Sequence, residues 1–294
     1  MAAEALTPER LVARARSLAS ALPDLRMEAR RIAMTINAGW HGRRRAGPGE
    51  TFWQFRDYAP GEPASRIDWR RSARGRQLYV RESEWEAAHT LRLAADLSPS
   101  MAFASPEARA PKAERALLLA LVVAELSVAG AERVGVLGQG RARTGAQAVD
   151  LIARTLADQD GAPLPDRFDV RRYDDVVLFS DFLMADETRE ALFDRLAAAG
   201  ARAHLVHIID PAEEHFPFTG RTDFLDPESG RNLIAPRADR WQAPYRDLFA
   251  AFKAELAASA ARRGFRYLAH HSDQPASGVA IALHRALGLP PDAP

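Results

Sequence analysis

A short stretch of the chain, Asp96-Leu-Ser-Pro-Ser100, carries the residue types best suited to chemistry. An acid and two hydroxyls stand at alternate positions, directly after an apolar run over residues 91–95 that is typical of a β-strand. Oxygen ligands of this kind suit a hard divalent cation, with Mg²⁺ favoured over Ca²⁺. The first hypothesis is therefore a Mg²⁺ site made by Asp96, Ser98 and Ser100.

A second polar turn, Ser180-Asp181, follows an apolar run over residues 176–179. Ligands of open parallel sheets bind beyond the carboxyl ends of the strands, where the strand order reverses. If the two strands are neighbours, Asp181 joins the first turn around one point, directly or through bound water. The alternative is structural: the serines of the first turn cap the next helix, and Asp96 only ends a strand. The sequence leaves both interpretations open.

The elements that must position these turns follow a regular pattern from about residue 90. Short continuous apolar runs alternate with helical segments, which predicts a parallel sheet covered on both faces. The strands are expected over residues 91–96, 134–137, 176–179, 205–209 and 267–269. The helices are expected over residues 112–128, 147–156, 187–199, 241–262 and 279–287. The expected fold class is α/β, with a doubly wound, mostly parallel, Rossmann-like sheet.

Composition divides the chain into two parts. Residues 1–89 contain helices predicted over about 7–22 and 24–36, followed by a segment rich in arginine and aromatic residues. Residues 90–294 form the expected α/β domain. Within that domain, residues 210–240 are rich in Pro, Phe, Asp and Gly and are expected to form a loop or hairpin.

The arginine- and aromatic-rich segment has two interpretations. Its ten arginines and four acids between residues 41 and 81 give a charge of about +6, which is one footprint of single-stranded nucleic-acid binding. Arginines also brace the turns of small, loop-rich units by bonding carboxylates and carbonyls. The structural interpretation is favoured for Arg56, Tyr58, Arg66, Asp68, Trp69 and Arg74. The run Arg43, Arg44 and Arg45 is a candidate for binding an acidic partner surface, or is an ordinary solvated charge run.

Other features exclude several classes of function. The 294 residues carry a net charge of +1, so no global field steers the protein toward nucleic acid or membrane. The chain has no cysteine, which excludes a thiol nucleophile and Cys-ligated zinc. It has no Gly-x-Ser-x-Gly elbow and no glycine-rich phosphate loop with its lysine. The histidine pairs 204/207 and 270/271 point to opposite strand faces and are expected to be satisfied polar side chains.

The sequence also bears on location. The first 23 residues carry Arg10, Arg14 and Arg16 and lack the uninterrupted apolar core of a signal peptide. The longest apolar run, over residues 116–124, is too short to span a bilayer. The protein is therefore expected to have no membrane span and to be cytoplasmic.

A longer motif carries a family resemblance. The chain contains the string Gly49-Glu50-x-Phe52-Trp53-x-Phe55-Arg56-x-Tyr58-x-Pro60-Gly61, followed by Arg66-Ile67-Asp68-Trp69, Ser72-Ala73-Arg74 and Tyr79-Val80-Arg81-Glu82. It resembles the signature of the bacterial domain-of-unknown-function 58 family. The Asp96 turn with the later Ser180-Asp181 is similar to a von Willebrand factor type A domain, which members of that family carry after the signature.

The resemblance implies a metal-ion-dependent adhesion site. Type A domains build that site from an Asp-x-Ser-x-Ser turn, a threonine on a second loop and an aspartate on a third. Here the turn residues Asp96, Ser98 and Ser100 and the later Asp181 match, but no threonine stands at the expected place. Thr144 is the nearest candidate. The site is therefore expected to be degenerate, with water completing the coordination, or vestigial.

The resemblance also implies a partner, because such proteins resemble accessory factors of MoxR-type AAA+ ATPases in the assembly or maturation of client proteins. The leading hypothesis is a non-enzymatic interaction module in which a carboxylate of the ATPase or client completes the metal shell. One alternative is a Mg²⁺-dependent enzyme that processes phosphoesters, with Asp181 as the base. Another is nucleic-acid binding through the arginine- and aromatic-rich segment.

Overall fold

The computed structural model of the chain describes residues 22–36, 52–59, 67–73, 75, 77–83, 89–159 and 161–288. These residues belong to two compact units. The larger unit contains the helix over residues 22–36 together with residues 89–288, and the smaller unit lies within residues 41–88.

This division differs from the one expected at residue 89, because the helix over residues 22–36 is part of the α/β unit. Leu25, Ala29 and Ala33 lie on one face of that helix and are buried in the core of the larger unit. The guanidinium of Arg26 forms an ion pair with Asp150. The helix expected over residues 7–22 lies outside the described residues.

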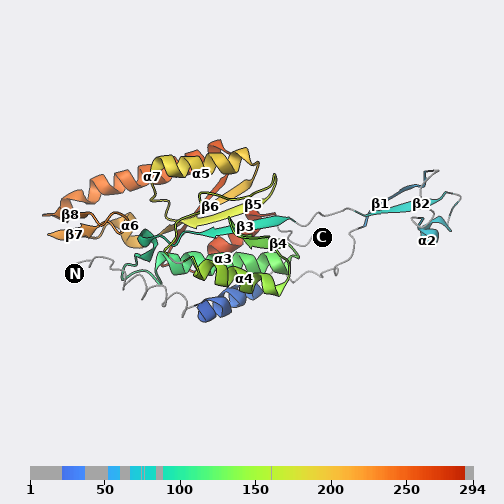
Figure 1. The fold of residues 1–294 in the computed structure, drawn as a ribbon, viewed down its shortest axis with the longest axis horizontal. Helices are drawn as coiled ribbons and strands as arrows, with labels where there is room; N and C mark the ends of the chain where they lie inside the picture. The colour runs from blue at the N-terminus through green and yellow to red at the C-terminus, as the bar shows by residue number, and fades with distance from the viewer. Residues whose placement is uncertain are drawn as a thin grey trace. The chain divides into compact units, whose positions relative to one another are not determined.

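A five-stranded parallel sheet forms the centre of the larger unit (Figure 1). Its strands are β3 (Thr90–Ala95), β4 (Arg133–Val136), β5 (Asp175–Ser180), β6 (Arg202–Ile209) and β9 (Arg266–His271). They lie in the order β4-β3-β5-β6-β9, so the order reverses between the neighbours β3 and β5. An α/β fold with a parallel sheet was predicted from the apolar runs, and it is confirmed.

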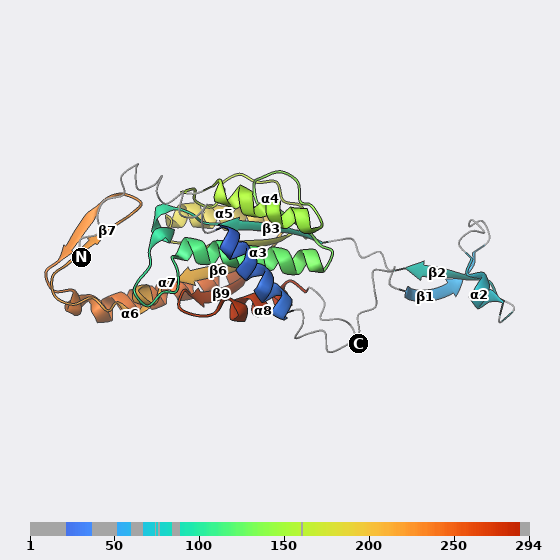
Figure 2. The same ribbon diagram turned by 90° about the horizontal axis from the view of Figure 1, so that it is seen from below.

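Helices cover both faces of the sheet (Figure 1), and Figure 2 looks onto the face that carries α3. One face carries the helix over residues 22–36 with α3 (Lys112–Ala129), α4 (Ala146–Ala157) and α8 (Ala276–Ala286), and the other carries α5 (Asp186–Ala198) and α7 (Gln242–Arg262). Alternate residues of β5 enter the two cores, with Val177 and Phe179 on one side and Val176 and Leu178 on the other. None of the helices among the described residues is both long and apolar enough to cross a membrane.

Residues 210–241 leave the sheet after β6 and form an excursion with its own aromatic core. The excursion contains α6 (Pro211–His215), β7 (Thr222–Leu225), β8 (Asn232–Ala235) and η3 (Ala238–Trp241). β7 and β8 pair as an antiparallel hairpin, whereas the helix α6 was not expected from the sequence. The ring of Phe216 lies 4.5 Å from that of Tyr245 on α7 and 5.5 Å from that of Phe224 on β7, measured between centroids. These ring contacts hold the excursion against the start of α7.

The smaller unit is a two-stranded antiparallel sheet with a short helix. It contains β1 (Phe52–Asp57), α2 (Trp69–Ser72) and β2 (Tyr79–Ser83). Asp68 caps α2, because its carboxylate accepts the backbone N–H of Arg71 at 2.9 Å. Asp68 thus stabilises the start of this helix, whereas its bracing by arginine side chains stays a prediction.

Among the other residues of this unit that were expected to have a structural role, the structure describes the side chains of Trp69 and Tyr58 only. Trp69 is 59% exposed, so it does not form the core of the unit. Tyr58 is half-buried and follows β1. The side chain of Arg56, the whole of Arg66 and Arg74, and the run 43–45 lie outside the described residues.

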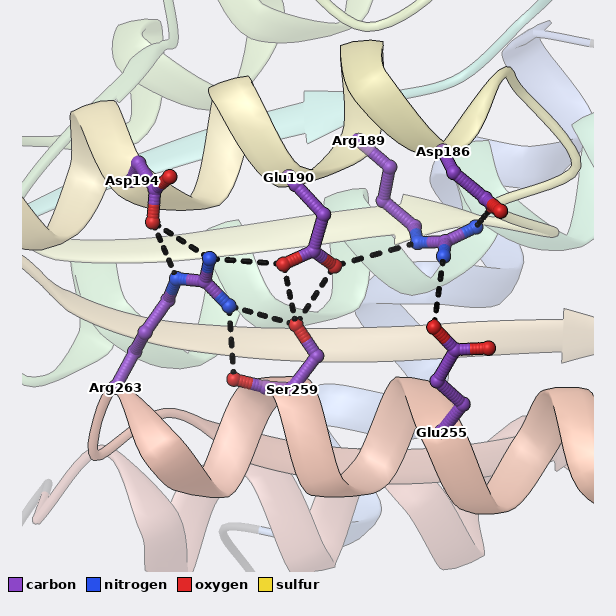
Figure 3. A network of polar contacts seen from close by, with 7 residues as sticks. All are labelled: Asp186, Arg189, Glu190, Asp194, Glu255, Ser259 and Arg263. Atoms are coloured by element: carbon purple, nitrogen blue, oxygen red, sulfur yellow. Dashed lines mark hydrogen bonds and ion pairs between the residues drawn. The ribbon is translucent and has the colours of Figure 1, made fainter.

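An ion-pair network joins α5 to the C-terminal half of α7 (Figure 3). The buried guanidinium of Arg189 lies 2.8 Å from the carboxylate of Asp186 and 4.0 Å from that of Glu255 on α7. It also lies 5.5 Å from the ring centroid of Phe252. Arg263, directly after α7, completes the network through Glu190, Asp194 and Ser259. A buried arginine with several partners of this kind fixes the position of the long helix.

We expect Arg189→Ala to lower the free energy of unfolding by about 2–4 kcal/mol, because it removes a buried side chain that packs against Phe252 and leaves a cavity between α5 and α7. Urea denaturation measures the change. The matched control is Arg262→Ala, an exposed arginine at the end of α7, for which we expect a change within about 0.5 kcal/mol. Equal stability of both variants would show that the network does not hold α5 and α7 together.

Candidate functional site

The loops after β3 and β5 meet at the carboxyl edge of the sheet, as the sequence predicted. The backbone N–H of Asp96 donates to the carbonyl of Phe179 at 2.8 Å, so β3 and β5 remain paired up to the ends of the strands. The hydroxyl of Ser180 then donates to the carboxylate of Asp96 at 2.6 Å. Asp181 is the next residue, and it is 2% exposed. The two predicted acids therefore face one polar cluster.

The two serines of the first turn belong to the same cluster. The backbone N–H of Ser98 donates to Asp96 at 3.0 Å, and the hydroxyls of Ser98 and Ser100 lie 3.3 Å apart. The side chain of Ser100 hydrogen-bonds Asp181. Ser98 begins the 3₁₀ helix η2 (Pro99–Ala102) without a side-chain cap bond, so capping does not account for the serine.

Thr144 does not belong to the cluster. The preceding residue, Arg143, pairs antiparallel with Val134 at the start of β4. The chain has therefore returned to the amino edge of the sheet by this point. Thr144 is exposed there, at the opposite edge from Asp96.

A buried lysine that the sequence analysis missed stands in the centre of the cluster. Lys112, the first residue of α3, is 0% exposed. Its Nζ donates to the Oδ2 of Asp181 at 2.8 Å and forms a second ion pair with Glu213 of α6. The other oxygen of Glu213 accepts the backbone N–H of Asp210 at 2.9 Å. The ammonium thus joins α3, the loop after β5 and the capping box of α6.

Burial and charge oppose each other in this cluster. Burial alone would raise the pKa of Asp181, but the ammonium of Lys112, together with hydrogen bonds from Leu183 and Ser100, outweighs it and holds that pKa below its usual range. Burial would lower the pKa of Lys112, but the two carboxylates together raise it. Burial raises the pKa of Glu213, and Lys112 offsets only part of that effect. Burial and the nearby Asp181 carboxylate likewise raise the pKa of Asp96. The charged pair at the centre is therefore Lys112 with Asp181.

These residues do not fit the Mg²⁺ that the sequence suggested. Octahedral Mg²⁺ needs anionic or neutral oxygens with free lone pairs, and it repels a cation in its shell. Lys112 already places an ammonium against Asp181, while the Asp96 carboxylate accepts bonds from Ser180 and Ser98. Across the part of the chain that the structure describes, no group of three or more His, Asp or Glu side chains is arranged to hold a metal ion.

An apolar pocket of about 520 Å³ opens beside the cluster. Its walls come from the excursion, from η2, from the loop after β5 and from α7, with Ser100 and Glu213 as the polar members. Aromatic and aliphatic side chains form most of the lining: Phe103, Leu183, Phe216, Phe218, Phe224, Leu225 and Tyr245. The pocket thus has an apolar wall, and Ser100 and Glu213 of the polar cluster form its polar side.

The histidines differ from one another more than the sequence suggested. The Nδ1 of His207 lies 2.8 Å from the hydroxyl of Tyr267, and burial lowers the pKa of His207 to about 3. His270 is bonded to Arg115, and His271 to Glu214. His204 is buried, and its Nε2 lies 3.6 Å from the carboxylate of Asp175, although neither ring nitrogen has a hydrogen-bond partner among the described residues.

Comparison with known proteins gives a family and a few relatives. The model of the family described as "Protein of unknown function DUF58" matches residues 54–259. Uncharacterised proteins from Mycobacterium bovis and Mycobacterium tuberculosis are each 29% identical to the chain over 231 residues, which is 72% of this chain and 72% of each relative.

Two solved structures are also similar. One is an aerotolerance-related membrane protein from Bacteroides fragilis, with 14% identity over 68% of this chain and 98% of that chain, at a TM-score of 0.40. The other is the conserved hypothetical protein BatB from Bacteroides thetaiotaomicron, with the same identity and coverage at a TM-score of 0.36.

We expect Lys112→Met to lower the free energy of unfolding by about 3–5 kcal/mol, because Asp181 and Glu213 would remain buried without their cation. The double variant Lys112→Met/Asp181→Asn should be less destabilised than the sum of the two single changes, by more than about 1 kcal/mol. Lys253→Met is the control, since Lys253 forms a partly exposed pair with Glu214. If the two changes in the free energy of unfolding are strictly additive, the ion pair between Lys112 and Asp181 does not stabilise the protein.

Acid should destabilise the protein through His207. Its folded pKa of about 3 lies below the unfolded value, so the stability it contributes above pH 6.5 is lost as pH falls toward 3. Between pH 7 and pH 5 this group should remove about 2 kcal/mol from the free energy of unfolding. Urea denaturation at both pH values should show a smaller loss in His207→Gln than in the wild type. The exposed His215→Gln should retain the wild-type loss, and an unchanged loss in His207→Gln would refute the assignment.

Proposed function

Because the chain belongs to the protein family of unknown function DUF58, whose description assigns no activity, we propose a function from the site itself. The protein is a non-enzymatic docking module that holds a partner protein at the carboxyl edge of its sheet. The observation that carries the proposal is the open apolar pocket beside a polar cluster whose charges are already paired. The sheet with its Asp96 turn is, in this proposal, a von Willebrand factor type A-like domain.

The chemistry of the cluster supports docking rather than catalysis. A general base or nucleophile must reach the reacting atom of a substrate. Asp181, the base required by the phosphoester-processing alternative, is buried and bonded to Lys112. Ser98 and Ser100 lie against each other and against the two aspartates. A cluster whose charges are paired internally in this way shapes the edge of the sheet without acting on a substrate.

The pocket has the composition of a protein-binding surface. Interface centres are enriched in aromatic residues and depleted of charge. Phe103 and Leu183 are both partly exposed at this pocket, at 39% and 48%. A partner side chain that enters the pocket therefore buries apolar area on both sides.

The charges around the pocket indicate the chemistry of the partner. Glu213 lines it but is already paired with Lys112, so the acids open to a partner are Asp226 and Glu228, which are exposed on the turn between β7 and β8 next to the pocket. Glu228 accepts the backbone N–H of Ser100 at 2.9 Å, so this carboxylate stands at the edge of the cluster. The described lining contains no lysine or arginine. The complementary occupant is an apolar segment that carries a basic residue, rather than the acidic residue of the metal hypothesis.

We place this segment on a MoxR-type AAA+ ATPase or its client, which the family resemblance suggested. Docking then needs no divalent cation, because Lys112 supplies the positive charge between the acids. The Mg²⁺-assisted form of docking is the alternative that the experiment below separates. The cytoplasmic location expected from the sequence stays a prediction.

Leu183→Arg should weaken binding of the MoxR-type ATPase encoded in the same genome at least tenfold, because it places a bulky cation in the pocket mouth. Leu151→Arg is the matched control, since Leu151 is similarly exposed but lies on α4, away from the pocket. Biolayer interferometry on the full chain, with and without EDTA, measures both effects. EDTA should leave the affinity unchanged.

Wild-type affinity in Leu183→Arg would remove the pocket from the proposal. Affinity abolished both by EDTA and by Asp96→Ala would establish the Mg²⁺-assisted form instead. Turnover of a phosphoester that Asp181→Asn abolishes would establish the enzyme.

A further inference from the structure

A second pocket, of about 430 Å³, lies at the opposite edge of the sheet and is lined by arginines. Its lining includes Thr90 and Arg133, the first residues of β3 and β4, and Asp174, which directly precedes β5. This position is the amino edge of the sheet, so the pocket is independent of the docking surface at the carboxyl edge. Four arginines line it: Arg92, Arg133, Arg141 and Arg171.

The strand register makes room for the innermost of these arginines. Arg92 on β3 is paired with Gly135 on β4. A Cβ atom on Gly135 would lie 3.0 Å from the Nη1 of Arg92, so the glycine leaves the space that the guanidinium uses. The Nη1 of Arg92 donates to the carbonyl of Gly140 at 3.1 Å. Its Nε is buried and has no hydrogen-bond partner among the described residues.

The turn after β4 closes one side of the pocket. Gly138 and Gly140 have φ values of 75° and 52°, a backbone conformation that glycine adopts readily. The turn folds back so that Arg143 pairs with Val134, which brings Arg141 to the pocket. On the other side, the N–H of Arg171 donates to the carboxylate of Asp174 at 3.1 Å, which fixes the backbone that carries the fourth arginine.

The charges of this pocket are not balanced within the described chain. None of the four arginines forms an ion pair with a carboxylate of the described residues. Asp169 and Asp174 also line the pocket, so four positive and two negative side chains give a formal charge of +2. Guanidinium groups held together repel one another, and an unpaired buried N–H loses a hydrogen bond, so the arrangement gains most from an added anion.

We propose that this pocket binds a small molecule that carries a diphosphate group. Guanidinium groups match the geometry of phosphate oxygens through paired hydrogen bonds, and arginine is the preferred residue for this contact. A diphosphate carries enough negative charge to neutralise the pocket. The volume lies within the range of small-molecule sites, which favours a ligand enclosed by the pocket over a polymer laid across a surface.

Titration calorimetry of the full chain at constant ionic strength tests the proposal. The probes are inorganic pyrophosphate, ADP, adenosine and a ten-nucleotide single-stranded DNA. Pyrophosphate and ADP should bind, and adenosine should not. The double variant Arg141→Gln/Arg171→Gln changes two exposed arginines and should weaken both ligands at least tenfold. Arg262→Gln, an exposed arginine on α7, is the matched control and should leave both affinities unchanged.

Absence of binding by both pyrophosphate and ADP would overturn the proposal, as would equal weakening by Arg262→Gln. Tighter binding of the DNA than of ADP, with a steep fall in affinity as salt rises, would mean that the arginines serve a polymer instead. Tighter binding of ADP than of pyrophosphate would support the proposal and show that the nucleoside part also contributes to binding. The outcome is separate from the docking test, because Leu183 and the four arginines line different pockets.

Discussion

The ammonium of Lys112, held between Asp181 and Glu213, is the interaction on which the carboxyl edge of this protein depends. Removing the charged Lys112 and Asp181 from water is costly, and the geometry offsets that cost only while the two remain paired and Lys112 keeps its contact with Glu213. The pairing links the start of α3, the loop after β5 and the short helix α6. It thereby fixes the point at which residues 210–241 leave the sheet, and with it the aromatic pocket. A site that resembles a metal centre in its sequence is in this way built around an internal cation.

The two edges of the parallel sheet have opposite chemistry. At the carboxyl edge, acids are neutralised from within and aromatic side chains are left open to a partner. At the amino edge, Arg92 and three further arginines remain without acidic partners among the described residues. The irregular crossover between α4 and β5, over residues 161–174, contributes to this contrast because it supplies Asp169, Arg171 and Asp174 to the arginine pocket. The ion-pair network of Arg189 and Arg263 holds α7 against α5 on one face of the sheet (Figure 3).

Much of the fold could be predicted because the strands are continuous apolar runs and the helices are long. The meeting of Asp96 and Asp181 could also be predicted, since both follow strands and parallel strands end at one edge. Lys112 could not: a lysine at a helix start is typical of exposed positions, and its partners lie 69 and 101 residues away. The arginine pocket could not be predicted from the sequence either, because its residues come from separate segments. Thr144 was placed wrongly because the chain turns back after β4, which no local pattern indicated.

Titration of the wild-type protein with Mn²⁺, a spectroscopic substitute for Mg²⁺, followed by electron paramagnetic resonance, tests the central claim most directly. If Lys112 takes the place of a divalent cation, no stoichiometric Mn²⁺ site should exist at the carboxyl edge, and the spectrum should be that of free Mn²⁺. One Mn²⁺ bound per chain, and lost on Asp96→Asn, would show that a metal displaces the ammonium and would contradict the account.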